Sequence, residues 1–399
     1  MVVPTILITV LAFALRARSQ GGLSCSIPSN PNSYSSQKLP DPFTFINGTR
    51  LSNIEQWACR KEEIKTLLQR YELGPLPPGP SSLVASIPSE NRLKIDISYN
   101  GKSIALNVSI KLPPGGGDGP FPAIILLGNT TIPQNAGVAH IQLDAEDLAK
   151  TENRGRGRFY DLYGTGIETG ALLAWVWGVS RLIDALETIP AQVTHIDATR
   201  IGIAGCGRYG KATLIAGGFE ERLKLSIPQD AGTGGTGCWR IVGELKKNGT
   251  KAEDAAGVIS GSQWFTQQFS RYTGNVNQLP YDHHMLAGLI SPRGLFITEN
   301  SGLDWLGPIS TYGCSIAGRL IFQTLGTTPS FGFSQTSHGD QKCGVQDAEQ
   351  PYLDSFISKF LLGKQGDNAV IFRTDRQYGF DLNRWVDWKF PDFFSQPSK

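Results

Sequence analysis

Residues 202–213 read GIAGCGRYGKAT, and this stretch decides how the rest of the chain is interpreted. It closes an apolar run, TRIGIAG, that is typical of a strand, and it leads into GKATLIAGGFEERL, whose length and pattern indicate a helix. A sharp turn from strand to helix needs residues without a Cβ clash, so glycines are expected here whatever the function. Gly205, Gly207 and Gly210 are therefore compatible with a purely structural turn, but they also fit three functional motifs.

Two of these motifs bind nucleotides. The glycines spell G-x-G-x-x-G, and Asp230 follows about 20 residues on, where a dinucleotide-binding domain has its ribose-binding acid. That fingerprint normally opens the first βαβ unit of its domain, whereas here hairpin and sheet patterns come first, and Cys206, an expected disulfide partner, stands beside the second glycine. The segment up to Lys211 also resembles a P-loop, but Ala212 replaces the Ser or Thr that holds Mg²⁺. A dinucleotide-binding oxidoreductase is thus an alternative that the sequence disfavours.

The third motif is the nucleophile elbow of α/β hydrolases, G-x-S-x-G. It exposes a serine on a strained turn, with the N-terminus of a helix behind it. In this chain the frame reads G-C-G-R-Y-G-K, and Gly207 occupies the position of the serine.

The flanking sequence alternates strand and helix patterns. Short apolar runs are separated by segments of helical length such as residues 170–189, GALLAWVWGVSRLIDALETI. Strands that are apolar on both sides indicate a parallel sheet buried under helices. We predict an α/β-hydrolase fold, a three-layer sandwich with a mostly parallel central sheet. The runs that predict its strands are PAIILLG (122–128), RIGIAG (200–205), LKLSIPQ (223–229), RGLFITEN (293–300) and PSFGFSQ (329–335).

Two upstream segments have patterns of their own. Residues 51–74 carry apolar side chains at helical spacing, which predicts a helix that a disulfide through Cys59 would fasten. Residues 92–113 alternate apolar and polar side chains around Asn100-Gly101, which predicts a β-hairpin.

The N-terminus indicates secretion. The apolar run from Val2 to Leu15 is too short to span a bilayer and fits a secretory signal. We therefore expect a signal peptide at 1–19 and a single domain at 20–399, with an N-terminal anchor helix as the alternative. The six cysteines predict three disulfides whose connectivity the spacing does not give. Glycosylation sequons at Asn47, Asn107, Asn129 and Asn248 suit an extracellular protein.

Composition limits the choice of partners. Lys and Arg total 37 and Asp and Glu total 35, so there is no electrostatic case for nucleic acid or an acidic membrane surface. We expect a monomer without metal or cofactor.

Beyond the elbow, the chain resembles the fungal glucuronoyl esterases of carbohydrate esterase family 15, whose elbow reads G-C-S-R-x-G-K. The similarity extends in family order through RFYDLYG, AWVWGVSRLIDALE, IPQDAGTGGTGCWRI, LPYDHHMLAGLISPRGLF, LDWLGP and ISKFLLG. The resemblance implies a secreted protein whose relatives cleave the ester between lignin alcohols and 4-O-methyl-glucuronate side chains of xylan. It also implies the disulfides Cys25–Cys59, Cys206–Cys343 and Cys238–Cys314.

The chain departs from this family at all three positions of the catalytic triad. Such hydrolysis needs a hydroxyl that a histidine makes nucleophilic and a carboxylate that orients the histidine. The resemblance places Gly207, Asp230 and Lys342 at the serine, glutamate and histidine positions. Gly207 offers no nucleophile, and a lysine is cationic at neutral pH and a poor base. His338 is a candidate substitute base, and Glu299 or Asp304 is a candidate substitute acid.

Residues that would bind the sugar acid are better preserved. By the same resemblance Arg208 matches an oxyanion-stabilising arginine. Lys211 and Trp305 match a lysine and a tryptophan that hold the sugar, and Glu253 stands where the family has a glutamine. Gly261 replaces a glutamate, so that contact is lost. The structural alternatives are a solvated lysine at the start of a helix and a tryptophan packed in the core.

We therefore predict a secreted glucuronoyl-esterase-like protein whose esterase activity is lost or weak. One alternative is a non-catalytic protein that binds glucuronate or glucuronoxylan. Another is an enzyme that hydrolyses glucuronate esters through His338 or an activated water.

Overall fold

The computed structural model describes residues 25, 34–115, 117, 119–128, 130–135, 137–364 and 370–394. The expected signal peptide at 1–19 and the sequon at Asn129 lie outside these residues. The sequon residues Asn47, Asn107 and Asn248 are exposed, and their modification stays a prediction.

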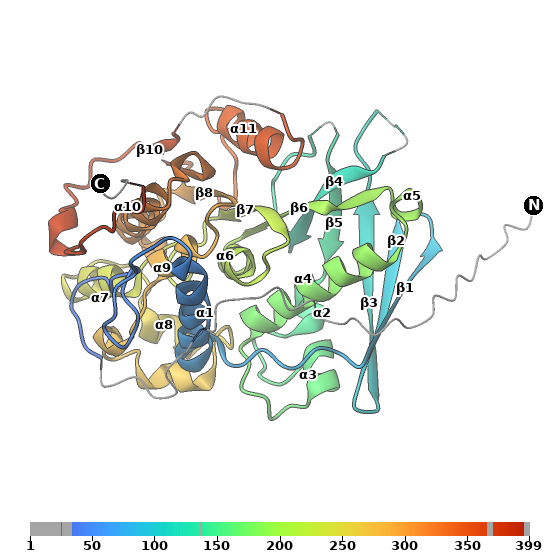
Figure 1. Ribbon diagram of the computed structural model, residues 1–399, viewed down its shortest axis with the longest axis horizontal. Coiled ribbons are helices and arrows are strands. Elements are labelled where there is room, and N and C mark those ends of the chain that lie inside the picture. The colour runs from blue at the N-terminus through green and yellow to red at the C-terminus, as the bar shows by residue number, and fades with distance from the viewer. Residues whose placement is uncertain are drawn as a thin grey trace, which may run out of the picture.

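Among these described residues, ten strands form one sheet in the order β1-β2-β3-β5-β4-β6-β7-β8-β9-β10 (Figure 1). The pairs from β1 through β3 to β5 are antiparallel, and every pair from β5 to β10 is parallel. The strands are β1 (Ser82–Ser89), β2 (Arg92–Tyr99), β3 (Lys102–Lys111), β4 (Phe121–Leu127), β5 (Ala139–Leu143), β6 (Ile196–Cys206), β7 (Leu223–Gln229), β8 (Gly294–Asn300), β9 (Phe331–Thr336) and β10 (Phe372–Thr374).

Helices cover both faces of this sheet, so the predicted mostly parallel, three-layer arrangement is confirmed (Figure 1). The side chains of β4 alternate between two cores. Ile125 and Leu127 join the larger core with α4 and α6, whereas Ile124 and Leu126 join a second core with α11. The helices are α1 (Gln56–Leu68), α2 (Ala145–Leu148), α3 (Arg158–Tyr163), α4 (Ala171–Thr188), α5 (Ala191–Thr194), α6 (Arg208–Phe219), α7 (Trp239–Lys247), α8 (Ala255–Gly261), α9 (His283–Gly288), α10 (Pro308–Thr324) and α11 (Gln350–Phe360).

The predicted hairpin is confirmed and its turn has a simple cause. Tyr99 of β2 pairs with Lys102 of β3, which leaves Asn100 and Gly101 as a two-residue turn. Their φ angles are 46° and 78°, which is the left-handed geometry that Asn-Gly tolerates best. The helix predicted over residues 51–74 is also present, as α1 followed by one π-helical turn at Gln69–Leu73.

Helix α4 packs against the first turn of α6, directly after Gly207. It is apolar on nearly every side and ends just before Pro190, whose ring disfavours a helical conformation at Ile189. The Trp175 indole N–H donates to the Ala149 carbonyl oxygen at 2.9 Å. The same ring stacks on Tyr209 at a centroid distance of 5.1 Å. The first turn of α6 is thereby fixed against a buried helix.

Three disulfides are formed, and they are the pairs that the family resemblance implies: Cys25–Cys59, Cys206–Cys343 and Cys238–Cys314. The second pair ties the end of β6 to the loop that follows β9. Within the described ranges, no helix is both long and apolar enough to cross a membrane.

The disulfide between Cys238 and Cys314 is expected to carry much of the stability of one end of the molecule. It joins α7 to α10 inside a small core that also contains Trp385 and Trp388. Replacing both cysteines by alanine should lower the free energy of unfolding by about 2–5 kcal/mol, since a constraint on the unfolded chain is lost. Urea titration under non-reducing conditions measures this, and an unchanged midpoint would contradict the expectation.

Candidate active site

Gly207 lies at the apex of the turn between β6 and α6. Its φ of 59° and ψ of −120° fall in a region that L-residues rarely adopt. Its N–H donates to the Gln229 carbonyl oxygen at 2.9 Å, which anchors the turn to the end of β7. The turn thus has the backbone conformation of a nucleophile elbow, which would strain a residue with a Cβ but not glycine.

The three glycines of the motif are present for different reasons. A Cβ on Gly205 would lie 2.6 Å from the Tyr209 carbonyl oxygen, and one on Gly210 would lie 2.5 Å from the Gln229 carbonyl oxygen. These two positions therefore have no room for a side chain. A Cβ on Gly207 would meet no heavy atom within 4 Å. The turn leaves open space at the one position of the three that could accept a side chain and has none.

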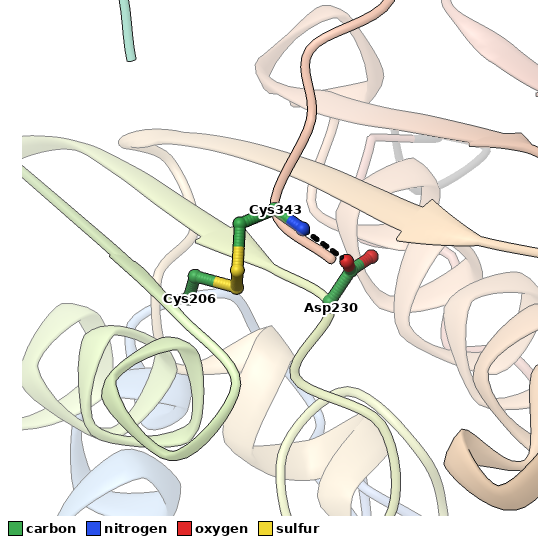
Figure 2. Close-up of side chains that lie close together, drawn as sticks. All are labelled: Cys206, Asp230 and Cys343. Atoms are coloured by element: carbon green, nitrogen blue, oxygen red, sulfur yellow. Dashed lines mark hydrogen bonds between the residues drawn. A yellow bond between two sulfur atoms is a disulfide. The ribbon is translucent and has the colours of Figure 1, made fainter. Parts of the chain in front are cut away.

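Asp230 follows β7 and faces the loop after β9. Its side chain is buried, and its φ is 42°. One carboxylate oxygen accepts from the Asn300 N–H at 2.7 Å. The other accepts from the Cys343 N–H at 2.6 Å (Figure 2). Burial raises the pKa of Asp230, and the two backbone donors oppose that rise. Each oxygen thus accepts one backbone N–H.

The two candidate bases lie on the same loop as Cys343. The Nδ1 atom of His338 lies 2.9 Å from the Gln341 carbonyl oxygen. The Lys342 side chain is exposed, and its ammonium lies 4.3 Å from the ring centroid of Trp305. Across the described residues, no hydrogen bond or ion pair joins either side chain to Asp230. The structure brings the predicted acid and both candidate bases to one place, without forming an acid–base pair.

Glu299, one of the candidate substitute acids, is buried beneath the site. Its Oε1 atom accepts from the N–H groups of Ala231 and Gly232 at 3.1 and 3.3 Å, and from the Thr236 hydroxyl. Burial, together with the negative charge of Asp230, raises the pKa of Glu299 to about 8. Glu299 therefore braces the loop that follows Asp230. Asp304, the other candidate, lies exposed at the start of the 3₁₀ turn Asp304–Leu306.

Arg208 directly follows Gly207 and is held by an acidic partner. Its Nε lies 3.2 Å from an oxygen of Glu146 in α2, and its guanidinium lies 5.0 Å from the centroid of the Tyr209 ring. Glu146 was not among the residues predicted from the sequence. Its signal was available, because Glu146 follows the carboxyl end of β5, an edge where parallel sheets gather functional groups.

The residues matched to sugar binding have unequal exposure. Lys211 is buried, and its ammonium donates to the carbonyl oxygens of Ala231 and Thr233 at 2.6 and 2.5 Å. Burial lowers its pKa to about 8, so the interpretation as a solvated lysine is wrong. Trp305 is 38% exposed, so it is not packed in the core. Glu253 is half-buried, and its N–H donates to the Trp305 carbonyl oxygen at 3.0 Å.

The remaining predicted position, Gly261, ends α8 and is exposed, and a Cβ placed there would have no heavy atom within 4 Å. One group of potential metal ligands occurs among the described residues: Cys206, Asp230 and Cys343 (Figure 2). Both sulfur atoms are joined in a disulfide, and the thiolate is the form that binds metals. These residues do not fit a metal site.

These features define a class of protein. A sharp glycine turn joins a central parallel strand to a helix, an acidic residue follows the next strand, and a loop after a later strand closes over both. This is the arrangement of an α/β hydrolase, and the predicted fold class is confirmed by solved structures of glucuronoyl esterases.

Comparisons with known proteins identify the family. A model of fungal glucuronyl esterases matches residues 95–326, and the chain belongs to this family. It is 47% identical over 377 residues to the 4-O-methyl-glucuronoyl methylesterase of Podospora anserina, covering 93% of this chain and 78% of that protein.

Two solved structures of the family are similar over nearly the whole chain. The glucuronoyl esterase catalytic domain from Hypocrea jecorina has a TM-score of 0.86 and 44% identity, with 92% of this chain and 99% of that chain covered. A glucuronoyl esterase from Sporotrichum thermophile has a TM-score of 0.89 and 40% identity, with 93% of this chain and 100% of that chain covered. The latter is a serine-to-alanine variant in complex with methyl 4-O-methyl-β-D-glucopyranuronate.

The raised pKa of Glu299 predicts how stability depends on pH. Its folded-state pKa of about 8 exceeds the ordinary value of 4.5, so folding favours its protonated form. The resulting stabilisation is complete below pH 4.5 and is lost as the pH rises through about 8. Glu299→Gln, which cannot ionise, should therefore gain stability relative to the natural chain between pH 5 and pH 9, on the order of a few kcal/mol.

Urea titrations at several pH values measure this difference. Glu90→Gln, at an exposed turn between β1 and β2, is the control and should show no such trend. A difference between Glu299→Gln and the natural chain that is independent of pH would contradict the expectation.

Proposed function

We propose that this chain is a secreted glucuronoyl-esterase-like protein that retains the site for a glucuronate unit but hydrolyses its esters weakly or not at all. The observation that carries this proposal is the open space at Gly207. The family fold, the elbow and the oxyanion-side arginine are present, and no atom in the elbow can form an acyl-enzyme.

The contacts of Asp230 and Lys342 support the same conclusion. A triad acid acts by accepting a hydrogen bond from the base and orienting it. Here each oxygen of Asp230 accepts one backbone N–H, neither candidate base in the described loop donates to it, and Lys342 rests on Trp305. Removing members of a triad lowers turnover by about 10⁴- to 10⁶-fold. We expect the turnover of this chain to be reduced by a factor of this size.

Retention of the sugar site is the second part of the proposal. Trp305 is exposed beside Glu253, and an indole face is a common platform for a sugar ring. The relatives are named for action on 4-O-methyl-glucuronoyl esters, and one solved structure holds such an ester. We therefore infer that glucuronate or glucuronoxylan fragments bind here, so that the chain acts as a binding protein where turnover is absent.

Hydrolysis through a displaced base is a second candidate. His338 lies on the loop that carries Cys343, so its ring could activate a water molecule near the elbow. Its Nδ1 contact with Gln341 orients the ring but brings no carboxylate to it. This route lacks the covalent intermediate and is the less favoured one.

Secretion is supported by the disulfides, which persist in oxidising compartments. We infer a monomer that acts outside the cell, without nucleic-acid or membrane partners.

An esterase assay on restored variants tests the loss of chemistry. The natural chain should show a rate near background on a benzyl ester of glucuronate, because it has no nucleophile. Gly207→Ser combined with Lys342→His should raise the rate by about 10²-fold or more. Each single substitution alone serves as a control and should give little gain. A natural chain that matches the double variant, with activity abolished by His338→Ala, would support the displaced base instead.

Thermal unfolding tests the sugar site. Glucuronate at tenfold above its Kd should raise the Tm of the natural chain by roughly 2 °C. Trp305→Ala should remove this shift, since the stacking platform is lost. Phe390→Ala, at another exposed aromatic residue, is the matched control and should keep the shift. No shift in the natural chain at any concentration would contradict the retained site.

A further inference from the structure

Lys342 brings a positive charge to the loop that is crosslinked beside Gly207. It precedes Cys343, whose disulfide partner Cys206 directly precedes Gly207. The Lys342 ammonium lies over Trp305 at 4.3 Å from the ring centroid, and both side chains are exposed. A histidine at this position would be largely neutral at pH 7, whereas the lysine is charged.

This ammonium has no carboxylate partner among the described residues. Asp230 accepts a backbone N–H on each oxygen and forms no ion pair with Lys342; burial raises the pKa of Asp230, and the charge of Lys342 is one of the smaller effects that oppose this rise. Glu146 is paired with Arg208 at 3.2 Å. The buried Lys211 adds a further positive charge; burial lowers its pKa, Glu253 and Glu299 oppose this, and Lys342 lowers it by a smaller amount. The site therefore presents a cation that rests on an aromatic ring instead of pairing with an acid in the described part of the chain.

That contact makes ligand binding sensitive to charge. A sugar ring that stacks on Trp305 competes with the Lys342 ammonium for the ring and weakens the cation–π contact. A neutral ester offers the displaced ammonium no charged partner. A free carboxylate, next to the same sugar ring, forms a charge-assisted hydrogen bond with it. The open space beside Gly207 leaves room for an oxygen of such a carboxylate.

We propose that Lys342 is a specificity-determining residue that makes this pocket select the free carboxylate of a glucuronate unit over its esters. This inference rests on the proposed function, because it assumes that the sugar binds at Trp305. It names the ligand class as a de-esterified glucuronate side chain, which is the acid that the family reaction releases.

Calorimetric titration of the natural chain tests this selection. The two ligands are the methyl glycoside of glucuronic acid and the methyl ester of that same glycoside. The acid should bind about 10-fold or more tightly than the ester at low salt, as a charge-assisted contact predicts. Lys342→Gln should bring the ratio close to 1 by weakening acid binding alone. Lys102→Gln, on the exposed hairpin of β2 and β3, is the matched control and should keep the ratio.

A salt titration of the natural chain is an independent measurement. Sodium chloride at about 0.5 M should weaken binding of the acid and leave binding of the ester unchanged, because salt screens exposed charges. Equal affinity for acid and ester, or an acid preference that survives Lys342→Gln, overturns the role of Lys342 and leaves the sugar site intact. Binding of neither ligand overturns this proposal and the sugar site together.

Chromatography of the titrated sample detects any hydrolysis of the ester. Such hydrolysis contradicts the loss of turnover but not the preference for the free carboxylate. The effect of Lys342→Gln on acid binding then still decides this proposal: a loss of about 10-fold supports it, and an unchanged affinity overturns it.

Discussion

The site depends on the covalent link between Cys206 and Cys343. These residues are 137 positions apart, and their bond holds the loop after β9 against the end of β6. The same loop presents the Cys343 N–H to Asp230 and places Lys342 on Trp305. The crosslink therefore holds the base position beside the elbow, whereas the pairing of β6 with β7 and the bond from the Gly207 N–H to Gln229 bring the elbow and the acid position together.

The fold could be predicted from the sequence because local and global signals agree. The alternation of short apolar runs with helical segments predicted the parallel strands and α4, and Asn100-Gly101 predicted the hairpin. The disulfide pairing could not be obtained from spacing and came from family resemblance. Strands β1, β5 and β10 were not predicted, because their patterns acquire meaning only beside neighbouring strands.

The place of the candidate site in the chain was predicted, whereas the hydrogen bonding and burial of its residues were not. Resemblance to the family assigned Gly207, Asp230 and Lys342 to the triad positions, and these assignments stay predictions. The sequence could not show that backbone N–H groups donate to Asp230 or that Glu146 forms an ion pair with Arg208. It also could not show that the buried Lys211 ammonium donates to two carbonyl oxygens. Burial and hydrogen bonding of such groups come from segments distant in the chain, so motif spacing does not encode them.

The left-handed backbone of Gly207 has a consequence for how this scaffold can change over evolutionary time. A residue with a Cβ must be forced into that conformation, at a cost on the order of 1–3 kcal/mol, while glycine adopts it freely. Replacing a nucleophile by glycine at this apex therefore removes backbone strain. Because the space beside Gly207 is open, no neighbouring residue needs to move. Hydrolases of this fold keep their reactive residue in a strained backbone conformation. A lineage that no longer needs the reaction can replace that residue with glycine and gain folding stability.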